Sequence, residues 1–135
     1  MAKFESNLEE INKSTVTVFN FLSDFNNFEK LMPEQVINWK STELNCSFTI
    51  KGMADIAMQI SEKIPYSKVV IIPEGETKLR FNLVCLTNVI TENKCSAQII
   101  IEADINPMMS MMVSKPLQNF VNILAQRLKE LMEKQ

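Results

Sequence analysis

Histidine is absent from this chain of 135 residues, and glycine occurs only twice. Without histidine there is no Ser–His or Cys–His pair to activate a nucleophile, and no imidazole to bind a metal. The two glycines, Gly52 and Gly75, are too few to form a phosphate-binding glycine loop. We therefore expect no metal, no cofactor and none of the common nucleophilic mechanisms.

Neither sign of charge dominates the chain. Charged residues make up 22% of it, hydrophobic residues 46%, and the formal net charge is −2. These values are those of an ordinary globular protein, and they give a nucleic-acid partner no basic surface to bind. The length suits one domain with a real core, and no repeat, linker or low-complexity segment divides it. We expect a single domain spanning residues 1–135.

Long hydrophobic runs are also missing. Lys3, Glu5 and Glu9 interrupt any apolar run near the start, so nothing there resembles a signal peptide. No apolar stretch approaches the roughly 18–20 residues needed to cross a bilayer. We expect no transmembrane segment and a cytoplasmic location. In that reducing compartment Cys46, Cys85 and Cys95, an odd set without CxxC spacing, are interpreted as small buried hydrophobic residues rather than reactive thiols.

Apolar residues alternate with polar ones over much of the chain, which is the pattern of half-buried β-strands. The sequence predicts a first strand over 3–11, and the further strands are expected over 37–42, 46–51, 54–61, 68–72, 79–86 and 96–105. Val84, Leu86 and Ile100 are exceptions, because they put apolar side chains on the outer face. Gly52 marks a turn or bulge.

Helical spacing appears in two regions. Ser14 and Asp24 are candidate N-caps of two short helices, the second ended by Pro33. Asn106 and Pro107 predict the start of a long helix that runs to about Glu133 with one apolar stripe, and Pro116 predicts a kink inside it. A curved antiparallel sheet followed by one long helix predicts an α+β helix-grip fold, with two short helices after the first strand.

The start of this long helix holds four methionines, Met108, Met109, Met111 and Met112. Methionine is flexible, so these residues suit a core, the lining of an adaptable cavity, or an exposed patch that binds a partner. Four methionines in five positions cover more than one helix face, so some are expected to be exposed or to meet the short helices.

Few polar residues suggest chemistry. Arg80 and Arg127 are the only arginines, and either could hold a carboxylate at a pocket mouth, although alternation places Arg80 on the outer face. Glu102 and Asp104 share the polar face of one strand, which favours a solvated surface over paired-carboxylate catalysis. Trp39 and Tyr66 can each offer a hydrogen-bond donor near a rim.

Three stretches resemble a small bacterial subgroup of the START-like superfamily, the SRPBCC group that includes the birch-pollen-allergen and polyketide-cyclase types. They are residues 3–7 (KFESN), 22–30 (LSDFNNFEK) and 107–118 (PMMSMMVSKPLQ). The resemblance covers nearly the whole chain. It implies a helix-grip fold with a cavity between sheet and helix. Members bind lipids, sterols, polyketides or other apolar molecules, and some are enzymes or co-chaperones. No catalytic motif of an enzymatic branch can be matched here.

Three functions remain open, because one fold supports many activities. The first is non-enzymatic binding of a small hydrophobic or amphipathic ligand. The residues expected to line its cavity are Phe25, Phe28, Phe48, Ile50, Ile56, Met58, Phe81, Leu83, Ile99, Ile101, Met109, Met112 and Phe120. The second is a protein-interaction module that uses the methionine-rich surface to bind a protein partner or a second copy of the chain. The third is a cyclase- or dehydratase-like enzyme, which needs a buried ionisable group that the sequence does not reveal.

Overall fold

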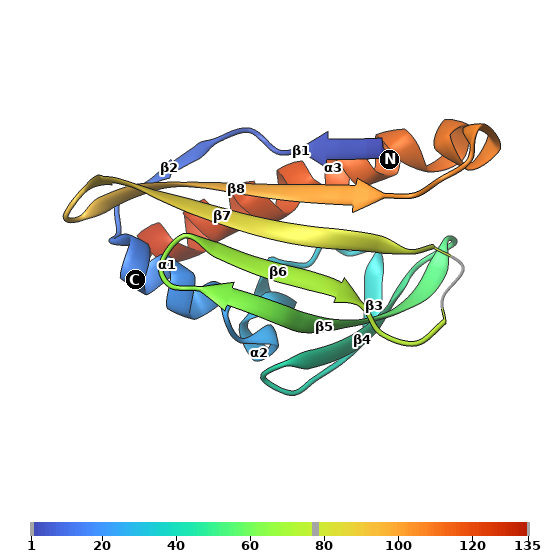
Figure 1. Cartoon of the computed structure of the whole chain (residues 1–135), viewed down its shortest axis with the longest axis horizontal. Coiled ribbons are helices and arrows are strands. Elements are labelled where there is room, and N and C mark those ends of the chain that lie inside the picture. The colour runs from blue at the N-terminus through green and yellow to red at the C-terminus, as the bar shows by residue number, and fades with distance from the viewer. Residues whose placement is uncertain (1, 77–78, 135) are drawn as a thin grey trace.

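The computed structural model describes residues 2–76 and 79–134 as one antiparallel sheet with helices packed against one of its faces (Figure 1). The strands are β1 Ala2–Glu5, β2 Glu9–Ile11, β3 Val36–Ser41, β4 Asn45–Ile50, β5 Ala54–Ile64, β6 Lys68–Pro73, β7 Phe81–Thr91 and β8 Lys94–Ala103. The helices are α1 Thr15–Leu22, α2 Phe25–Phe28, the short 3₁₀ helix η1 Glu29–Leu31, and α3 Pro107–Glu133.

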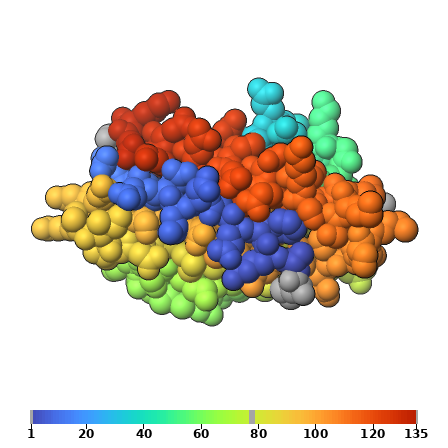
Figure 2. Space-filling view, turned by 90° about the horizontal axis from the view of Figure 1, so that it is seen from above, coloured from blue at the N-terminus to red at the C-terminus, as the bar shows by residue number. Residues whose placement is uncertain are grey.

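The strand order is β1-β8-β7-β6-β5-β4-β3, with β2 also paired to β8. The chain therefore begins on one edge of the sheet, and its third strand forms the other edge. Figure 2 shows both layers, with the orange and red α3 along one side of the molecule and the light yellow-green part of the sheet on the opposite side. This arrangement is the α+β helix-grip fold that the sequence predicts.

Local signals set the helix boundaries. The side chain of Asn106 caps α3 by accepting a hydrogen bond from the Met109 backbone N–H at 2.8 Å, and Pro107 follows it. The Ser14 and Asp24 side chains cap α1 and α2 in the same way. All three predicted caps are confirmed. The helix continues through Pro116, and a kink there stays a prediction.

The predicted single strand over 3–11 is wrong, because the structure divides it into β1 and β2. At the break Ser6 turns its buried side chain to the sheet, where Oγ accepts a hydrogen bond from the Ile99 N–H at 2.9 Å. The Gln98 side chain also donates to the Ser6 carbonyl at 3.0 Å. The Ser6 N–H still donates to the Ile99 carbonyl at 2.9 Å, but the other two bonds at this break involve side chains, and regular pairing with β8 resumes at Glu9.

Two of the three exceptions to alternation, Val84 and Ile100, are neighbours in the sheet. Val84 faces Val70 of β6 on one side and Ile100 of β8 on the other, and Val84 and Ile100 are both buried. These side chains form a cross-strand row on the outer face. The side chains of this row bury one another on the outer face of the sheet, which the helices do not cover.

The core fills the space between the inner sheet face and the helices. From α3 it receives the predicted stripe, whose buried members are Val113, Leu117, Phe120, Val121, Leu124, Ala125, Leu128 and Met132. Among the described residues, three hydrogen bonds tie the helix to the rest of the chain, and in the first the Asn12 N–H donates to the Glu133 carboxylate at 3.1 Å. Gln118 Nε2 donates to the Glu5 carbonyl of β1 at 2.8 Å, and Arg127 donates to the Met32 carbonyl just after η1.

Candidate functional site

Space between α3 and the sheet exists in two places, which we call the inner void and the cleft. The inner void has a volume of about 10 Å³, so the side chains around it fill almost all of the space between them. Its lining residues come from α2, the sheet and α3, and are Phe25, Phe28, Met32, Trp39, Cys46, Phe48, Met58, Phe81, Leu83 and Phe120. A water molecule needs at least that much room, so the void is too small for a ligand in this structure.

Aromatic rings close the inner void. Phe25 and Phe28 meet edge to face with ring centroids 5.2 Å apart, and Trp39 stacks on Phe48 at 5.3 Å. Both arrangements are favourable for aromatic pairs. The indole N–H of Trp39 donates to the Ser41 hydroxyl at 3.1 Å, so its donor is already used within the fold.

The cleft is much larger, at about 450 Å³. Three segments form it: the residues between η1 and β3, the turn that joins β4 to β5, and the first half of α3. Its lining residues are Pro33, Gln35, Val36, Ile50, Lys51, Gly52, Met53, Met112, Pro116, Leu117, Asn119, Phe120 and Ile123. In Figure 2 the cyan segment before β3 and the green β4–β5 turn project beside the orange part of α3.

The sequence signals that build the cleft are local and simple. Gly52 has φ +78°, a left-handed conformation that glycine adopts without strain, and it permits the tight turn between β4 and β5. On α3, Met112, Pro116, Asn119 and Ile123 follow one another at helical spacing along one side. The cleft is therefore a gap between a turn and a helix face.

The predicted cavity residues separate into three groups. Phe25, Phe28, Phe48, Met58, Phe81, Leu83 and Phe120 surround the inner void, and Ile50, Met112 and Phe120 line the cleft. Ile56, Ile99 and Ile101 are buried in the core and line neither space, and the partly buried Met109 packs against that core. Phe120 is the one residue that borders both spaces.

Sequence reasoning missed most of the cleft, including Gln35, Lys51, Met53 and Asn119. Pro116 and Gly52 were noted only as a kink and a turn. The spacing of Met112, Pro116, Asn119 and Ile123 could have indicated a second face of the helix beside the buried stripe. No local signal places Lys51 against that face, since this depends on how far the β4–β5 turn reaches over the helix.

The methionines at the start of α3 are mostly exposed, as the sequence predicts for some of them. Met108, Met111 and Met112 are 76%, 90% and 72% exposed. They lie at positions i, i+3 and i+4 and so share one face of the helix. Only Met112 of these three contributes to the cleft.

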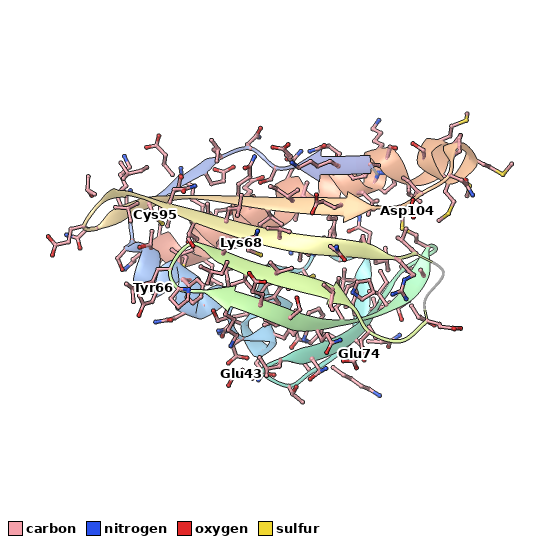
Figure 3. The ribbon with its side chains drawn as sticks, in the orientation of Figure 1. Glu43, Tyr66, Lys68, Glu74, Cys95 and Asp104 are labelled. Atoms are coloured by element: carbon pink, nitrogen blue, oxygen red, sulfur yellow. The ribbon has the colours of Figure 1, made fainter. Side chains whose placement is uncertain are left out.

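The ionisable side chains of the described residues lie mainly at the surface. The only buried polar or charged residues are Ser6, Thr15 and Thr87, and no group of three His, Cys, Asp or Glu residues there could hold a metal. Asp104 and Glu74, labelled in Figure 3, come from well-separated parts of the ribbon. Arg80 donates to the Gly75 carbonyl at 2.6 Å, so both arginines bind backbone oxygens of the fold.

The three cysteines are free and buried. Burial raises the pKa of the Cys85 thiol to about 12, and burial together with the charge of Glu74 raises that of Cys46 to about 12 as well. Burial also raises the pKa of Cys95. These thiols keep their protons at neutral pH and lack the thiolate that a nucleophile needs.

Tyr66 lies away from both spaces. It stands at the end of the sheet near α1 (Figure 3), where its ring meets Phe19 edge to face at 5.5 Å. It lines neither the cleft nor the inner void.

In the described part of the chain, no helix has the length and apolar character needed to cross a membrane.

Comparison with known proteins identifies the architecture. No protein-family model matches the chain, and no curated protein matches it by sequence. A START superfamily protein from Mycobacterium smegmatis superposes with a TM-score of 0.70 at 11% identity, covering 98% of this chain and 97% of that one. A conserved protein from Geobacillus kaustophilus gives a TM-score of 0.76 at 11% identity, covering 98% and 96%.

A plant enzyme is also similar. Norcoclaurine synthase from Thalictrum flavum, in complex with dopamine and hydroxybenzaldehyde, superposes with a TM-score of 0.72 at 10% identity, covering 98% of this chain and 87% of that one. Identities this low show a shared fold, while function must be argued from the site. The chain has the START-like fold, in which a curved antiparallel sheet holds one long C-terminal helix.

Proposed function

We propose that this protein binds a small hydrophobic or amphipathic molecule, lipid-like or polyketide-like, in the cleft between α3 and the β4–β5 turn. The observation that carries the proposal is the cleft itself, which offers about 450 Å³ and a mainly apolar wall. Ligand sites in proteins commonly measure about 300–1,000 Å³ and combine apolar walls with a few polar groups. Both properties apply here.

The inner residues have a supporting role in this proposal. Ile50, Met112 and Phe120 touch the ligand from the cleft wall, and the aromatic side chains around the inner void hold Phe120 in place behind it. Met53 and Met112 line the cleft together, and their flexible side chains can adapt to ligands of different shape.

Two further points bear on the proposal: the first supports ligand binding by this fold, and the second disfavours catalysis. Norcoclaurine synthase, which has the same fold, accommodates the small aromatic molecules dopamine and hydroxybenzaldehyde. Of the described residues that line the cleft of this chain, Lys51 is the one that is ionisable. A cyclase or dehydratase needs a positioned acid or base pair, whereas a binding protein needs only the apolar wall and a polar contact.

A blocking substitution tests the proposal. Asn119 is exposed and lines the cleft, so Asn119→Trp should fill the space without disturbing the core. Gln126, exposed on the same helix but outside the cleft, gives the matched control Gln126→Trp. We expect the neutral dye Nile red to bind wild type and the control with enhanced fluorescence, and to lose most of that affinity in Asn119→Trp. Equal binding by all three proteins, or no binding by any, would overturn the proposal.

A second candidate function is self-association through the exposed methionine face. Met108 and Met111 present flexible apolar surface, and the first turn of α3 contains no acidic residue. The same face of a second copy can therefore meet it in a two-fold contact without carboxylate repulsion. Sedimentation should then show a dimer at high concentration that Met111→Glu abolishes, and a strictly monomeric wild type would exclude this function.

A further inference from the structure

Among the residues that the structure describes, Lys51 is the only charged one that lines the cleft. The rest of the wall is mainly apolar, with two amide side chains, those of Gln35 and Asn119. Among the described residues, the ammonium group of Lys51 makes no ion pair and no hydrogen bond. The cleft thus combines an apolar wall with one unpaired positive charge.

The backbone of Lys51 is held firmly although its side chain is unpartnered. Its N–H donates to the Gln35 carbonyl at 2.7 Å, which joins the turn to the segment before β3. The Met53 N–H donates to the Ile50 carbonyl at 2.9 Å and closes the turn, and Gly52 supplies the positive φ between them. The exposed Lys51 side chain therefore extends from a fixed point in the turn that borders the cleft.

The acidic residues beside the β4–β5 turn and in the segment before β3 do not line the cleft. Glu34 is exposed and forms no ion pair with Lys51 in the described chain, and it does not line the cleft. Asp55 accepts a hydrogen bond from the Thr49 hydroxyl at 2.7 Å and, like Glu34, is absent from the cleft wall. An anionic group in the cleft would meet Lys51 and the two amides, and no lining carboxylate would oppose it.

From these contacts we infer that the ligand is an amphipathic anion, whose head group binds Lys51 while its apolar part lies against Ile50, Met53, Met112 and Phe120. The shared chemistry is that of a fatty acid or an aromatic carboxylate. An ammonium head group would face an unpaired like charge, and a neutral molecule would leave it unused. This inference rests on the proposed binding function and adds the charge of the ligand to it.

Matched probes separate the charge from the apolar contact. Decanoate and decanol each have ten carbons, and at pH 8 in dilute salt decanoate has a negatively charged head group while decanol has a neutral one. Because the head group stays partly in water, we expect wild type to bind decanoate roughly three- to five-fold more tightly than decanol, as measured by displacement of Nile red. High salt should reduce this preference by screening.

Substitutions at Lys51 provide the decisive comparison. Lys51→Gln should bind both probes alike, and Lys51→Glu should prefer decanol. Lys134→Gln removes an equal charge at the far end of α3 and should keep the wild-type preference. A preference for decanoate that survives Lys51→Gln would overturn the role of Lys51.

Different results would contradict the charge of the ligand and the proposed binding function. If wild type binds decanoate and decanol equally, and Asn119→Trp abolishes both, the charge of the ligand is wrong and the cleft still binds apolar molecules. If neither probe nor Nile red binds, the binding function fails and the inference falls with it.

Discussion

The indole of Trp39 lies almost parallel to the ring of Phe48, with ring centroids 5.3 Å apart and an interplanar angle of 21°. The two rings come from neighbouring strands, β3 and β4, at the edge of the sheet. Both line the inner void, so their contact closes the space behind the cleft. Trp39 is the only tryptophan in the chain, which makes its fluorescence a specific reporter of this packing.

Replacing Phe48 by alanine should open this region. Phe48 is 5% exposed, and truncating a buried phenylalanine typically costs about 3–5 kcal/mol in the free energy of unfolding. Urea unfolding should show this loss, and the Trp39 emission should shift as its stacked neighbour disappears. Val89, 69% exposed on β7, provides the control, because Val89→Ala should change stability by no more than about 0.5 kcal/mol. A loss in Phe48→Ala below 1 kcal/mol, of the order of a surface change, would contradict the packing described.

Phe120 separates the inner void from the cleft, since it borders both. Phe120→Ala should join the two spaces, and we expect lower stability by about 3 kcal/mol or more together with binding of bulkier apolar probes than wild type accepts. Phe120→Leu retains part of the barrier and should show intermediate behaviour in the same titrations. If Phe120→Ala binds no larger probes than wild type does, the division of the space by this ring is wrong.

The fold follows from the sequence more completely than the site does. Asn106 and Pro107 mark the start of α3 because capping is a local property, and the alternation from residue 97 onward predicts β8 for the same reason. The break at Ser6 could not be predicted, since it depends on hydrogen bonds from Gln98 and Ile99, more than 90 residues away.

The sequence predicts the cleft less well than the fold, for a related reason. It unites Gln35, Lys51 and Asn119 from three separate parts of the chain, and periodicity places each of them only within its own element. Periodicity does indicate which side chains face inward, such as Phe48 and Leu83. It cannot indicate whether those side chains enclose a cavity or fill it, because that depends on their final packing.

Alkaline pH should destabilise the protein through its buried thiols. A free thiol titrates near pH 9.0, whereas burial raises the pKa of Cys85 to about 12 in the folded state. Between these values the unfolded chain has lost a proton that the folded chain keeps, so the free energy of unfolding falls as pH rises. The slope should approach about 1.4 kcal/mol per pH unit for this thiol, and the contribution is fully present below pH 9.0.

Comparison of wild type with Cys85→Ala isolates this effect. The variant loses some stability at every pH from the missing sulfur, but its unfolding free energy should fall less steeply between pH 9 and 11. Tyrosine and lysine titrations are common to both proteins and cancel in the difference. Parallel curves would show that Cys85 does not carry the expected linkage.

The cap at Asn106 should control the first turns of α3, including the methionine face. Asn106→Ala removes the acceptor of the Met109 N–H and should cost about 1 kcal/mol, with faster hydrogen exchange over residues 108–112. Asn106→Asp keeps a capping oxygen and should restore both properties. Unchanged exchange in the alanine variant would show that tertiary contacts, rather than the cap, hold this end of the helix.

Native mass spectrometry of the protein purified from its own host tests the central claim most directly. We expect the spectra of wild type and Gln126→Trp to show the protein with an added small-molecule mass that denaturation releases. Asn119→Trp should be detected at the mass of the protein alone. The released species would identify the chemical class of the ligand. Detection of wild type only without an added mass, or of Asn119→Trp with the same added mass, would contradict ligand binding in the cleft.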